Sequence, residues 1–304
     1  MQREKLIPLW AFMLPLGAIL IWSLNIVVTR YISDYISPAS ISFYRWFFAF
    51  IILTPFMLPK VLKQRKEIKQ NLKKLAVLSA FGMVMYQGIA YTAAHYTTAT
   101  NMGIINAFIP VFTIVVSFFI LKDRPSIFAI LGSVISLCGL IYVVSRGNLS
   151  TLWESGGHLG DALMLCAVFF YAFYGVFLKK WQIKLPLLVS LYIQIIFAVI
   201  YHLPLITYFG LDHLNHQNIS SILYAGIFPS IISPFLWMMA VQQIGPSRTS
   251  IFMNLMPIFT AIIAVIWLDE KWTVYHTVGG ICILVGILLA QKQKVRYIIN
   301  KKLA

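Results

Sequence analysis

The chain contains long stretches in which nearly every residue is apolar, and these stretches limit the folds that are open to it. About 20 consecutive apolar residues cross a bilayer as a helix, and a helix satisfies its own backbone polar groups inside lipid. The apolar stretches are continuous and do not alternate with polar residues, which excludes a β-barrel. With 60% hydrophobic and 11% charged residues, the sequence predicts an all-α integral membrane protein. Ten spans are expected, at 9–30, 39–59, 74–94, 97–121, 126–145, 158–178, 187–209, 219–242, 247–268 and 273–291.

The basic residues follow these spans unevenly. If the N-terminus is cytoplasmic, 20 of the 24 lysines and arginines fall in cytoplasmic loops and tails, and only Arg30, Arg146 and Lys271 fall outside. This positive-inside bias predicts that both termini are cytoplasmic. The first span lacks a short apolar core and a cleavage site, so we expect a retained helix rather than a signal peptide. Because the net charge of +15 is spread over many cytoplasmic ends, we expect no nucleic-acid partner. The basic segment 60–74 either contacts anionic lipid headgroups or is a solvated loop.

Two apolar segments, "NAFIPVFTIVVSFFILKDRPS" from residue 106 and "MNLMPIFTAIIAVIWLDEKWT" from residue 253, share a register. Proline, phenylalanine, threonine, leucine and glycine recur at a constant offset of 147 residues. The matched pairs are Pro110 and Pro257, Phe112 and Phe259, Thr113 and Thr260, Leu121 and Leu268, Gly132 and Gly279, and Gly139 and Gly286. The sequence therefore predicts two five-helix repeats, 9–145 and 158–291. Because five is odd, the second repeat enters the membrane from the opposite side, an arrangement typical of secondary transporters.

The chain resembles a known family in the order of its motifs. The residues that carry the resemblance are "WSLN" at 22–25, an arginine in the second span, and a proline, phenylalanine, leucine, acidic, basic and two-glycine pattern that closes each half. Together they look like the EamA branch of the drug/metabolite transporter superfamily. The resemblance implies a bacterial-type inner-membrane permease with ten helices, often an exporter of amino acids or other small metabolites. The loop charges at 122–124 and 269–271 depart from the family pattern, and we expect them to fix hairpins rather than to select a substrate.

Polar and aromatic residues inside the spans suggest the lining of a cavity. Two prolines, Pro110 and Pro257, interrupt their helices, free a carbonyl group one turn earlier, and are expected to act as hinges. The alternative is that the small and polar residues only let helices pack and hydrogen-bond across their interfaces. The candidate substrate-binding residues are Trp22, Asn25, Arg45, Tyr86, Gln87, Asn106, Tyr171, Tyr174, Ser233, Trp237 and Asn254.

Arg45 and Asp161 are charged residues that do not stand at the ends of their spans. Arg45 stands about six residues from the outer start of its span, so its side chain either snorkels to the surface or faces an aqueous cavity. If Arg45 faces a cavity, its guanidinium would pair with a substrate carboxylate, with Asp161 or with free carbonyls near Pro110. Asp161 is the one acidic residue near a span interior, and it is either a proton-coupling group or a carboxylate that favours a helix N-terminus.

These patterns predict a function in transport rather than catalysis. The sequence has no GxxxxGK[ST] motif for ATP and no cluster of catalytic or metal-binding residues within its spans, so no catalytic residue, metal or cofactor is expected. We expect a multi-pass permease of the cell inner membrane that exports an amino acid or related amphiphilic solute, acts as a monomer or homodimer, and contacts membrane lipid. The alternatives are uptake of a nucleoside-like or cationic metabolite, such as the S-adenosylmethionine carried by similar proteins of some intracellular bacteria, and a non-transporting scaffold or sensor.

Overall fold

The computed structural model describes residues 10–122, 127–150, 158–244 and 252–303, and the regular elements in these ranges are all helical. Those of the first half are α1 (Trp10–Ile32), α2 (Pro38–Lys63), α3 (Arg65–Ser79), the π-helix η1 (Ala80–Met85), α4 (Tyr86–Ala93), α5 (Ala99–Asn106), α6 (Ile109–Leu121) and α7 (Ile127–Val144). Those of the second half are α8 (Leu159–Trp181), α9 (Leu187–Phe209), α10 (Ile219–Ile227), the π-helix η3 (Phe228–Ile232), α11 (Ser233–Ile244), the 3₁₀-helix η4 (Phe252–Leu255), α13 (Met256–Trp267) and α14 (Val274–Leu303).

Many of these helices have the length and composition of membrane spans. Seven helical stretches in the described ranges are long and apolar enough to cross a membrane, and three shorter apolar helices lie where the remaining spans were expected. The chain is therefore an all-helical, multi-pass membrane protein, while the count of ten crossings stays a prediction. The third span differs most from its expected bounds. Its helix already begins at Arg65, because the basic segment continues the helical hydrogen bonding beyond the apolar part.

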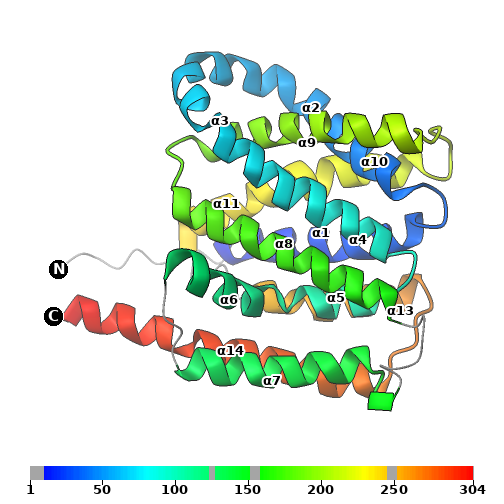
Figure 1. Ribbon diagram of the computed structural model, residues 1–304, viewed down its shortest axis with the longest axis vertical. Coiled ribbons are helices and arrows are strands. Elements are labelled where there is room, and N and C mark those ends of the chain that lie inside the picture. Colours follow the sequence, from blue (N-terminus) through cyan, green and yellow to red (C-terminus); the bar gives the residue numbers. More distant parts are fainter. Residues whose placement is uncertain (1–9, 123–126, 151–157, 245–251, 304) are drawn as a thin grey trace.

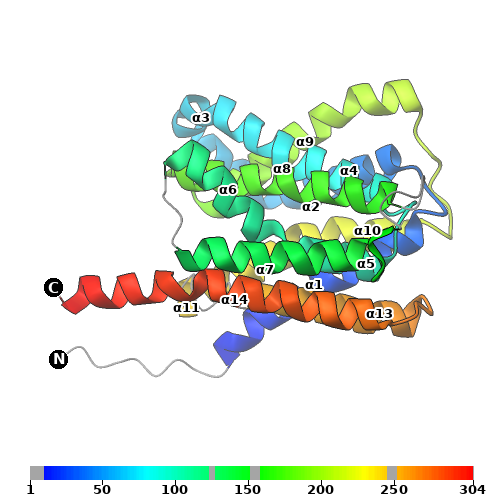
Figure 2. The same ribbon diagram turned by 60° about the horizontal axis from the view of Figure 1, so that its bottom comes forward.

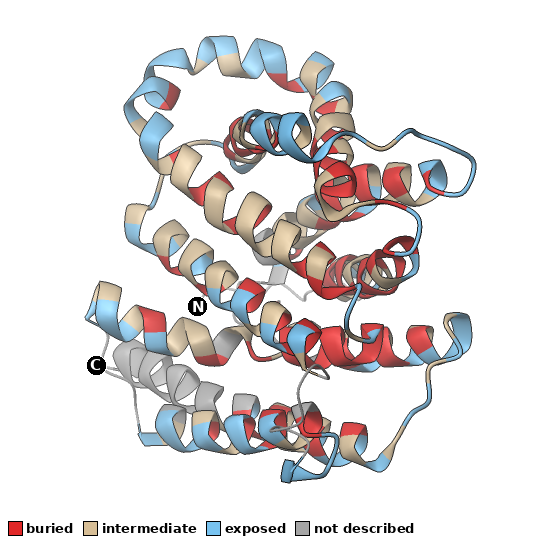
Figure 3. Cartoon of the chain, turned by 45° about the vertical axis from the view of Figure 1, so that its right-hand side comes forward, coloured by how far each residue is buried: buried red, intermediate tan, exposed pale blue. Residues whose placement is uncertain are grey.

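The outward faces of the bundle are apolar. Figure 3 shows exposed positions along these faces and buried positions directed toward the interior. Large apolar side chains such as Phe119 and Ile266 are exposed to the surroundings. In water such surfaces would favour aggregation, whereas in a bilayer the hydrocarbon chains cover them.

The helices lie roughly parallel, with α2 and α9 at one edge of the bundle and α7 and α14 at the opposite edge (Figure 1). Between these edges, α1 packs against α11 and α13, while α8 packs against α4 and α6. Helix α1 begins and α14 ends on the same side (Figure 1). We call this the terminal side and the other the distal side. The helix ends at Ile32, Ala93 and Val144 lie on the distal side.

We call the helical segment at each expected span a rod and number the rods in chain order. Four of the rods are interrupted, and the interruptions occur at equivalent places in the two halves. The fourth rod breaks between α5 and α6, where Pro110 lies in the first turn of α6. The ninth breaks between η4 and α13, where Pro257 lies in the first turn of α13. A proline cannot donate the backbone hydrogen bond of a continuous helix, so the chain restarts there. The third and eighth rods each contain a π-helix, η1 and η3.

Contacts between the halves are reciprocal. The packing of α1 on α11 corresponds to that of α4 on α8, and the packing of α1 on α13 corresponds to that of α6 on α8. Likewise, α2 meets α10 as α3 meets α9. Helices α2 and α9, and α7 and α14, pack directly against their own counterparts, and α5 packs on α13, the counterpart of α6. Apart from the contact of α5 with α13, each contact is thus repeated when the two halves are exchanged.

The contact between α7 and α14 is the closest of these. The two helices lie side by side and run in opposite directions in both views (Figures 1 and 2). A Cβ atom added to Gly139 would lie 2.6 Å from the carbonyl oxygen of Gly279, and one added to Gly286 would contact the backbone of Gly132. These four glycines are the ones that the 147-residue offset pairs. Backbones can approach this closely only where no side chain intervenes.

Candidate functional site

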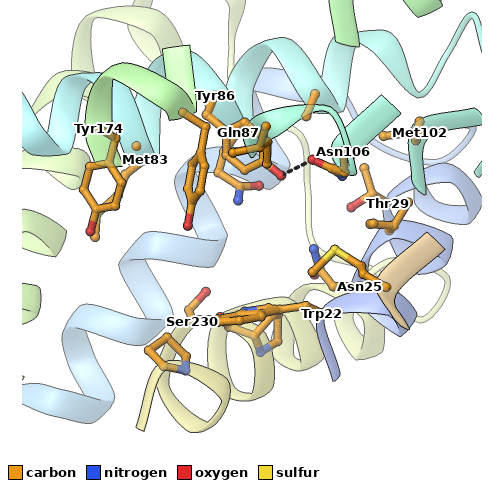
Figure 4. A pocket seen from close by; sticks show the side chains of 18 of the residues that line it. Trp22, Asn25, Thr29, Met83, Tyr86, Gln87, Met102, Asn106, Tyr174 and Ser230 are labelled. Atoms are coloured by element: carbon orange, nitrogen blue, oxygen red, sulfur yellow. Dashed lines mark hydrogen bonds between the residues drawn. The ribbon is translucent and has the colours of Figure 1, made fainter. Parts of the chain in front are cut away.

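A cavity of about 220 Å³ lies in the middle of the bundle, between the two halves. Its walls come from both of them, with α1, α2, η1, α4, α5 and α6 on one part and α8, α9, η3, α11, η4 and α13 on the other. Figure 4 shows Tyr86 and Gln87 on one wall, with Trp22 and Ser230 across the cavity from them. The volume lies somewhat below the usual range of drug-sized pockets and suits a small metabolite.

Arg45 of α2 carries a charge into this cavity. The side chain is only 3% exposed. Its Nε donates to Ser230 Oγ at 2.7 Å, and its Nη1 donates to Gln87 Oε1 at 2.8 Å and to Tyr91 OH at 3.3 Å. The guanidinium carbon also lies 4.9 Å from the ring centroid of Trp46. Of the two expectations for Arg45, the inward position therefore agrees with the structure, and snorkelling to the surface does not.

No carboxylate forms an ion pair with Arg45 within the described part of the chain. The Nη2 atom of Arg45 likewise has no hydrogen-bond partner there, because the contacts described above involve Nε and Nη1. A buried charge held only by neutral partners is costly, and in membrane proteins it marks a functional site. The free edge of the guanidinium is suited to a carboxylate or another anionic group.

Aromatic rings form much of the remaining wall. The rings of Tyr86 and Tyr171 lie 4.7 Å apart, and those of Tyr171 and Tyr174 lie 5.4 Å apart, measured between centroids. Tyr86 donates to Asn106 Oδ1 at 3.0 Å, which fixes the phenol against α5. Trp22 Nε1 donates to the carbonyl oxygen of Pro229 in η3 at 3.1 Å. These bonds hold the rings in place, so that they present flat apolar faces to a solute.

Asn25 of α1 provides an unused acceptor. Its side chain is 9% exposed and lines the cavity, and its Oδ1 atom has no hydrogen-bond partner among the described residues. A buried polar atom normally has a partner. Asn25 Oδ1 is therefore an unsatisfied acceptor in a residue of the cavity wall.

The cavity is closed at its distal end and more open toward the terminal side. Lining residues near the distal end, including Thr29, Arg45 and Met102, are buried, whereas Tyr174 and Met253 toward the terminal side are partly exposed. All eight residues of α5 are buried at the distal end. The described lining residues are thus more exposed toward the side on which α1 begins and α14 ends.

The structure brings most of the predicted residues together. Eight of them line the cavity, namely Trp22, Asn25, Arg45, Tyr86, Gln87, Asn106, Tyr171 and Tyr174. Ser233 does not, because it is fully buried and donates to the carbonyl oxygen of Ala18 at 3.2 Å. Trp237 is also outside the lining and instead packs its ring 5.6 Å from that of Trp22.

The predicted hinges lie at helix breaks. Pro257 is buried and is not among the residues that line the cavity, whereas its preceding residue Met256 is. The side chains of Pro110 and Asn254 lie outside the described residues, so their expected roles stay predictions.

The lining also contains residues that sequence reasoning did not single out for binding. Ser230 is the hydrogen-bond partner of Arg45. Five methionines contribute flexible apolar surface that can adapt to different solutes. In an apolar span a methionine gives no signal of its role, whereas the serine beside two prolines did mark an unusual segment. The methionines are Met83, Met102, Met164, Met253 and Met256.

The acidic residues outside the cavity have structural partners. Asp161 does not pair with Arg45, because it receives hydrogen bonds from Thr97 and Asn101 at the distal end. Glu270 accepts hydrogen bonds from the backbone N–H groups of Ala99 and Thr100 at 2.7 and 3.0 Å. It caps the start of α5 in the other half in this way, while the expected role of the loop charges in fixing their own hairpins stays a prediction. Asp123 lies outside the described residues.

A bundle of apolar helices that encloses a central polar and aromatic cavity has the architecture of a multi-pass membrane transporter. The sequence profile of the EamA-like transporter family matches residues 9–145 and 158–291, and the chain belongs to this family. Its relatives carry transporter names, which indicate transport rather than enzymatic catalysis.

Two relatives illustrate how far the similarity extends. The chain is 24% identical over 269 residues to "Uncharacterized transporter YyaM" of Bacillus subtilis (strain 168), across 86% of this chain and 87% of that protein. It is 26% identical over 276 residues to an "Uncharacterized transporter" of Archaeoglobus fulgidus, across 89% of this chain and 93% of that protein. A solved structure titled "Crystal structure of protein" matches with a TM-score of 0.66 at 14% identity, across 93% of this chain and 96% of that one. At this identity the match shows a shared fold.

Proposed function

We propose that the chain is a secondary transporter of the inner membrane that exports a small amphiphilic metabolite, such as an amino acid, by alternating access. The observation that carries this proposal is Arg45, a buried charge without a carboxylate partner in the described residues, in a cavity that both halves line. Such a charge is suited to a solute that supplies the missing anion.

The chemistry of the cavity supports a solute with three features. A carboxylate would accept hydrogen bonds from the free edge of Arg45. An amine or hydroxyl group would donate to Asn25 Oδ1, which has no partner in the described residues. An apolar body would lie against the aromatic faces of Tyr86 and Tyr171. Amino acids combine these features in one small molecule.

Export is supported by the side on which the cavity opens. The cavity is more exposed toward the terminal side, and the distribution of basic residues predicts that this side is cytoplasmic. A solute would then enter from the cytoplasm. The closed distal end would have to open to release it outside.

Alternating access is supported by the reciprocal packing of the halves. Two inverted five-helix repeats, 9–145 and 158–291, would exchange contacts with their counterparts when the bundle rocks about the central cavity. The helix breaks near Pro110 and Pro257 and the π-helices η1 and η3 are positions where the rods can bend.

Two alternatives make different predictions. Uptake of a purely cationic metabolite would place a positive charge near Arg45, which electrostatic repulsion disfavours. A nucleoside-like or zwitterionic solute such as S-adenosylmethionine would not meet this objection and belongs in the test. A scaffold or sensor would bind a partner but move no solute.

The test is transport in liposomes that contain the purified full-length chain. A panel of labelled amino acids, nucleosides and amines is measured for uptake and efflux, with and without a pH gradient, against protein-free liposomes. Concentration-dependent movement of a carboxylate-bearing solute, with slower movement of the matched amine that lacks the carboxylate, is the expected result. Movement of only the amines would contradict the role of Arg45, and no movement in either direction would contradict a transport function.

A further inference from the structure

A chain of polar side chains lies beyond the cavity, at the distal end of the bundle. Its centre is Asp161 in the first turn of α8, which is 2% exposed. Thr97 Oγ1 donates to Asp161 Oδ1 at 2.5 Å, and Asn101 Nδ2 lies 3.2 and 3.3 Å from the two carboxylate oxygens. The carboxylate is therefore held by two donors from the other half of the protein.

The hydrogen bonds of His276 define the direction of this chain. The backbone N–H of Thr273 can only donate, and it lies 3.2 Å from His276 Nδ1, so Nδ1 accepts and the neutral ring carries its proton on Nε2. That Nε2 donates to Asn101 Oδ1 at 3.2 Å. The amide of Asn101 is thereby oriented with its Nδ2 toward Asp161. We call the set Thr97, Asn101, Asp161, Thr273 and His276 the distal latch.

The distal latch joins the two halves directly above the cavity. Thr97 and Asn101 belong to the first half, and Asp161 and His276 to the second. Met102 follows Asn101 and Met164 follows Asp161 by one turn, and both line the cavity. A Cβ atom on Gly160 would lie 2.6 Å from the backbone of Tyr96, so the helices meet without space between them. Opening the cavity on this side requires these contacts to separate.

We propose that protonation of Asp161 releases the distal latch and opens the cavity toward the distal side. This inference rests on the alternating-access function proposed above. A proton from water on the distal side binds a carboxylate oxygen of Asp161, and hydrogen bonds to the neutral acid are about half as strong as those to the carboxylate. His276 keeps its bond across the latch when it is protonated, because Nε2 still donates to Asn101 Oδ1 and Thr273 Oγ1, 3.0 Å from Nδ1, can accept the new N–H. The weaker bonds at Asp161 therefore loosen the contact between the halves.

Other titratable and charged groups act on the distal latch. Arg146 and His158 lie near Asp161, and Glu270 in the loop before α14 lies near His276. The rings of Trp272 and Tyr275 also lie beside His276, at centroid distances of 5.5 and 4.2 Å. Because these charged groups surround the distal latch, the test depends on a substitution at Asp161 itself.

The test measures the distance across the distal latch by electron spin resonance of paired spin labels. Labels are attached at Tyr96→Cys and Val274→Cys, two exposed positions on either side of the contact between Asn101 and His276. The free cysteines Cys138, Cys166 and Cys282 are first replaced by alanine. The full-length chain is measured in lipid nanodiscs at pH 8 and at pH 5.5. We expect the population with the longer distance to rise about tenfold at pH 5.5, the factor that 1.4 kcal/mol produces.

The variants assign this response. Asp161→Asn imitates the protonated acid and is expected to show the longer distance at pH 8. Asp34→Asn is the matched control, because Asp34 is an exposed distal carboxylate outside the distal latch, and it should respond to pH as the unsubstituted chain does. A pH response that survives in Asp161→Asn would overturn the proposal, as would equal distances at both pH values without substitutions.

A further variant separates this proposal from the proposed function. Asn101→Ala removes the centre of the distal latch without any proton. If it lengthens the distance at pH 8 while the unsubstituted chain ignores pH, proton release is wrong and alternating access stands. If neither acid nor Asn101→Ala changes the distance, alternating access at this end is contradicted as well.

Discussion

Ser136 of α7 donates a hydrogen bond to the carbonyl oxygen of Ile283 in α14, and the two residues are 147 positions apart. The same number is the offset that aligns the two halves of the sequence. Position 136 therefore meets its own counterpart, and Gly139 and Gly279 lie on one side of it as Gly286 and Gly132 lie on the other. A local two-fold axis passes through the Ser136–Ile283 contact, perpendicular to two antiparallel helices.

The close approach of α7 and α14 predicts a strong effect of a single methyl group. Gly139→Ala should lower the stability of the folded protein by about 1–3 kcal/mol, because the new Cβ would lie 2.6 Å from the backbone of Gly279. Thermal unfolding of the purified chain in detergent measures this. Gly280→Ala, on the same pair of helices, is the control because its Cβ would meet nothing within 4 Å. Equal loss in both variants would show that helix propensity or handling, and not the glycine contact, determines stability.

Gly82 in η1 supports the position of Tyr174. A Cβ at this position would lie 2.6 Å from the ring of Tyr174, so Gly82→Ala should displace the ring from the cavity wall. We expect transport to fall severalfold while the amount of folded protein in the membrane stays similar. Gly88→Ala, in the same rod, has free space around its Cβ and should transport normally. Full activity of Gly82→Ala would argue against a role for the Tyr174 ring in solute binding.

Arg45→Lys keeps the positive charge but loses the planar group that donates to Ser230 and Gln87 at once. For a solute with a carboxylate, we expect transport at low solute concentration to fall about tenfold or more, with normal membrane insertion. The measurement compares uptake with the amount of protein in each liposome preparation. Unchanged transport by Arg45→Ala would leave Arg45 with only a structural role.

Asp212 predicts a pH-dependent stability at the distal surface. Burial raises the pKa of this carboxyl, but hydrogen bonds with Ser37 and Ser40 lower it by more than burial raises it. Its pKa therefore lies below the ordinary 3.8. A lowered pKa in the folded state adds stability above pH 3.8, and this stability is lost as pH falls through the folded value. The difference in unfolding temperature between the unsubstituted chain and Asp212→Asn should therefore shrink below about pH 4. A constant difference from pH 6 to pH 3 would contradict the assignment.

Much of the fold follows from hydropathy, because a long apolar run has one stable form in lipid. The bounds of α9, Leu187–Phe209, agree with the expected span 187–209. The importance of Arg45 was also visible, since few side chains are as costly in a span. The sequence did not show which side Arg45 faces, because its direction depends on Ser230, 185 residues further along the chain.

The errors in the site have a physical cause. Ser233 was predicted as a binding residue from a span read with 3.6 residues per turn. It directly follows the π-helix η3, whose turn is wider, and its hydroxyl is directed at α1 instead. The distal latch was not predicted at all. Its members Thr97, Asp161 and His276 come from three separate segments, and no local pattern connects them.

The π-helices also indicate which kind of genetic change the cavity would tolerate least. Each residue advances an α-helix by about 100°. The wider turn of η1 therefore changes the direction in which the side chains before it point relative to those after it. A substitution in this segment alters one side chain. Deletion of a single residue would instead rotate every preceding side chain of the rod relative to Tyr86 and Gln87, so the shape of the cavity is encoded in the length of η1 as much as in the identity of its residues.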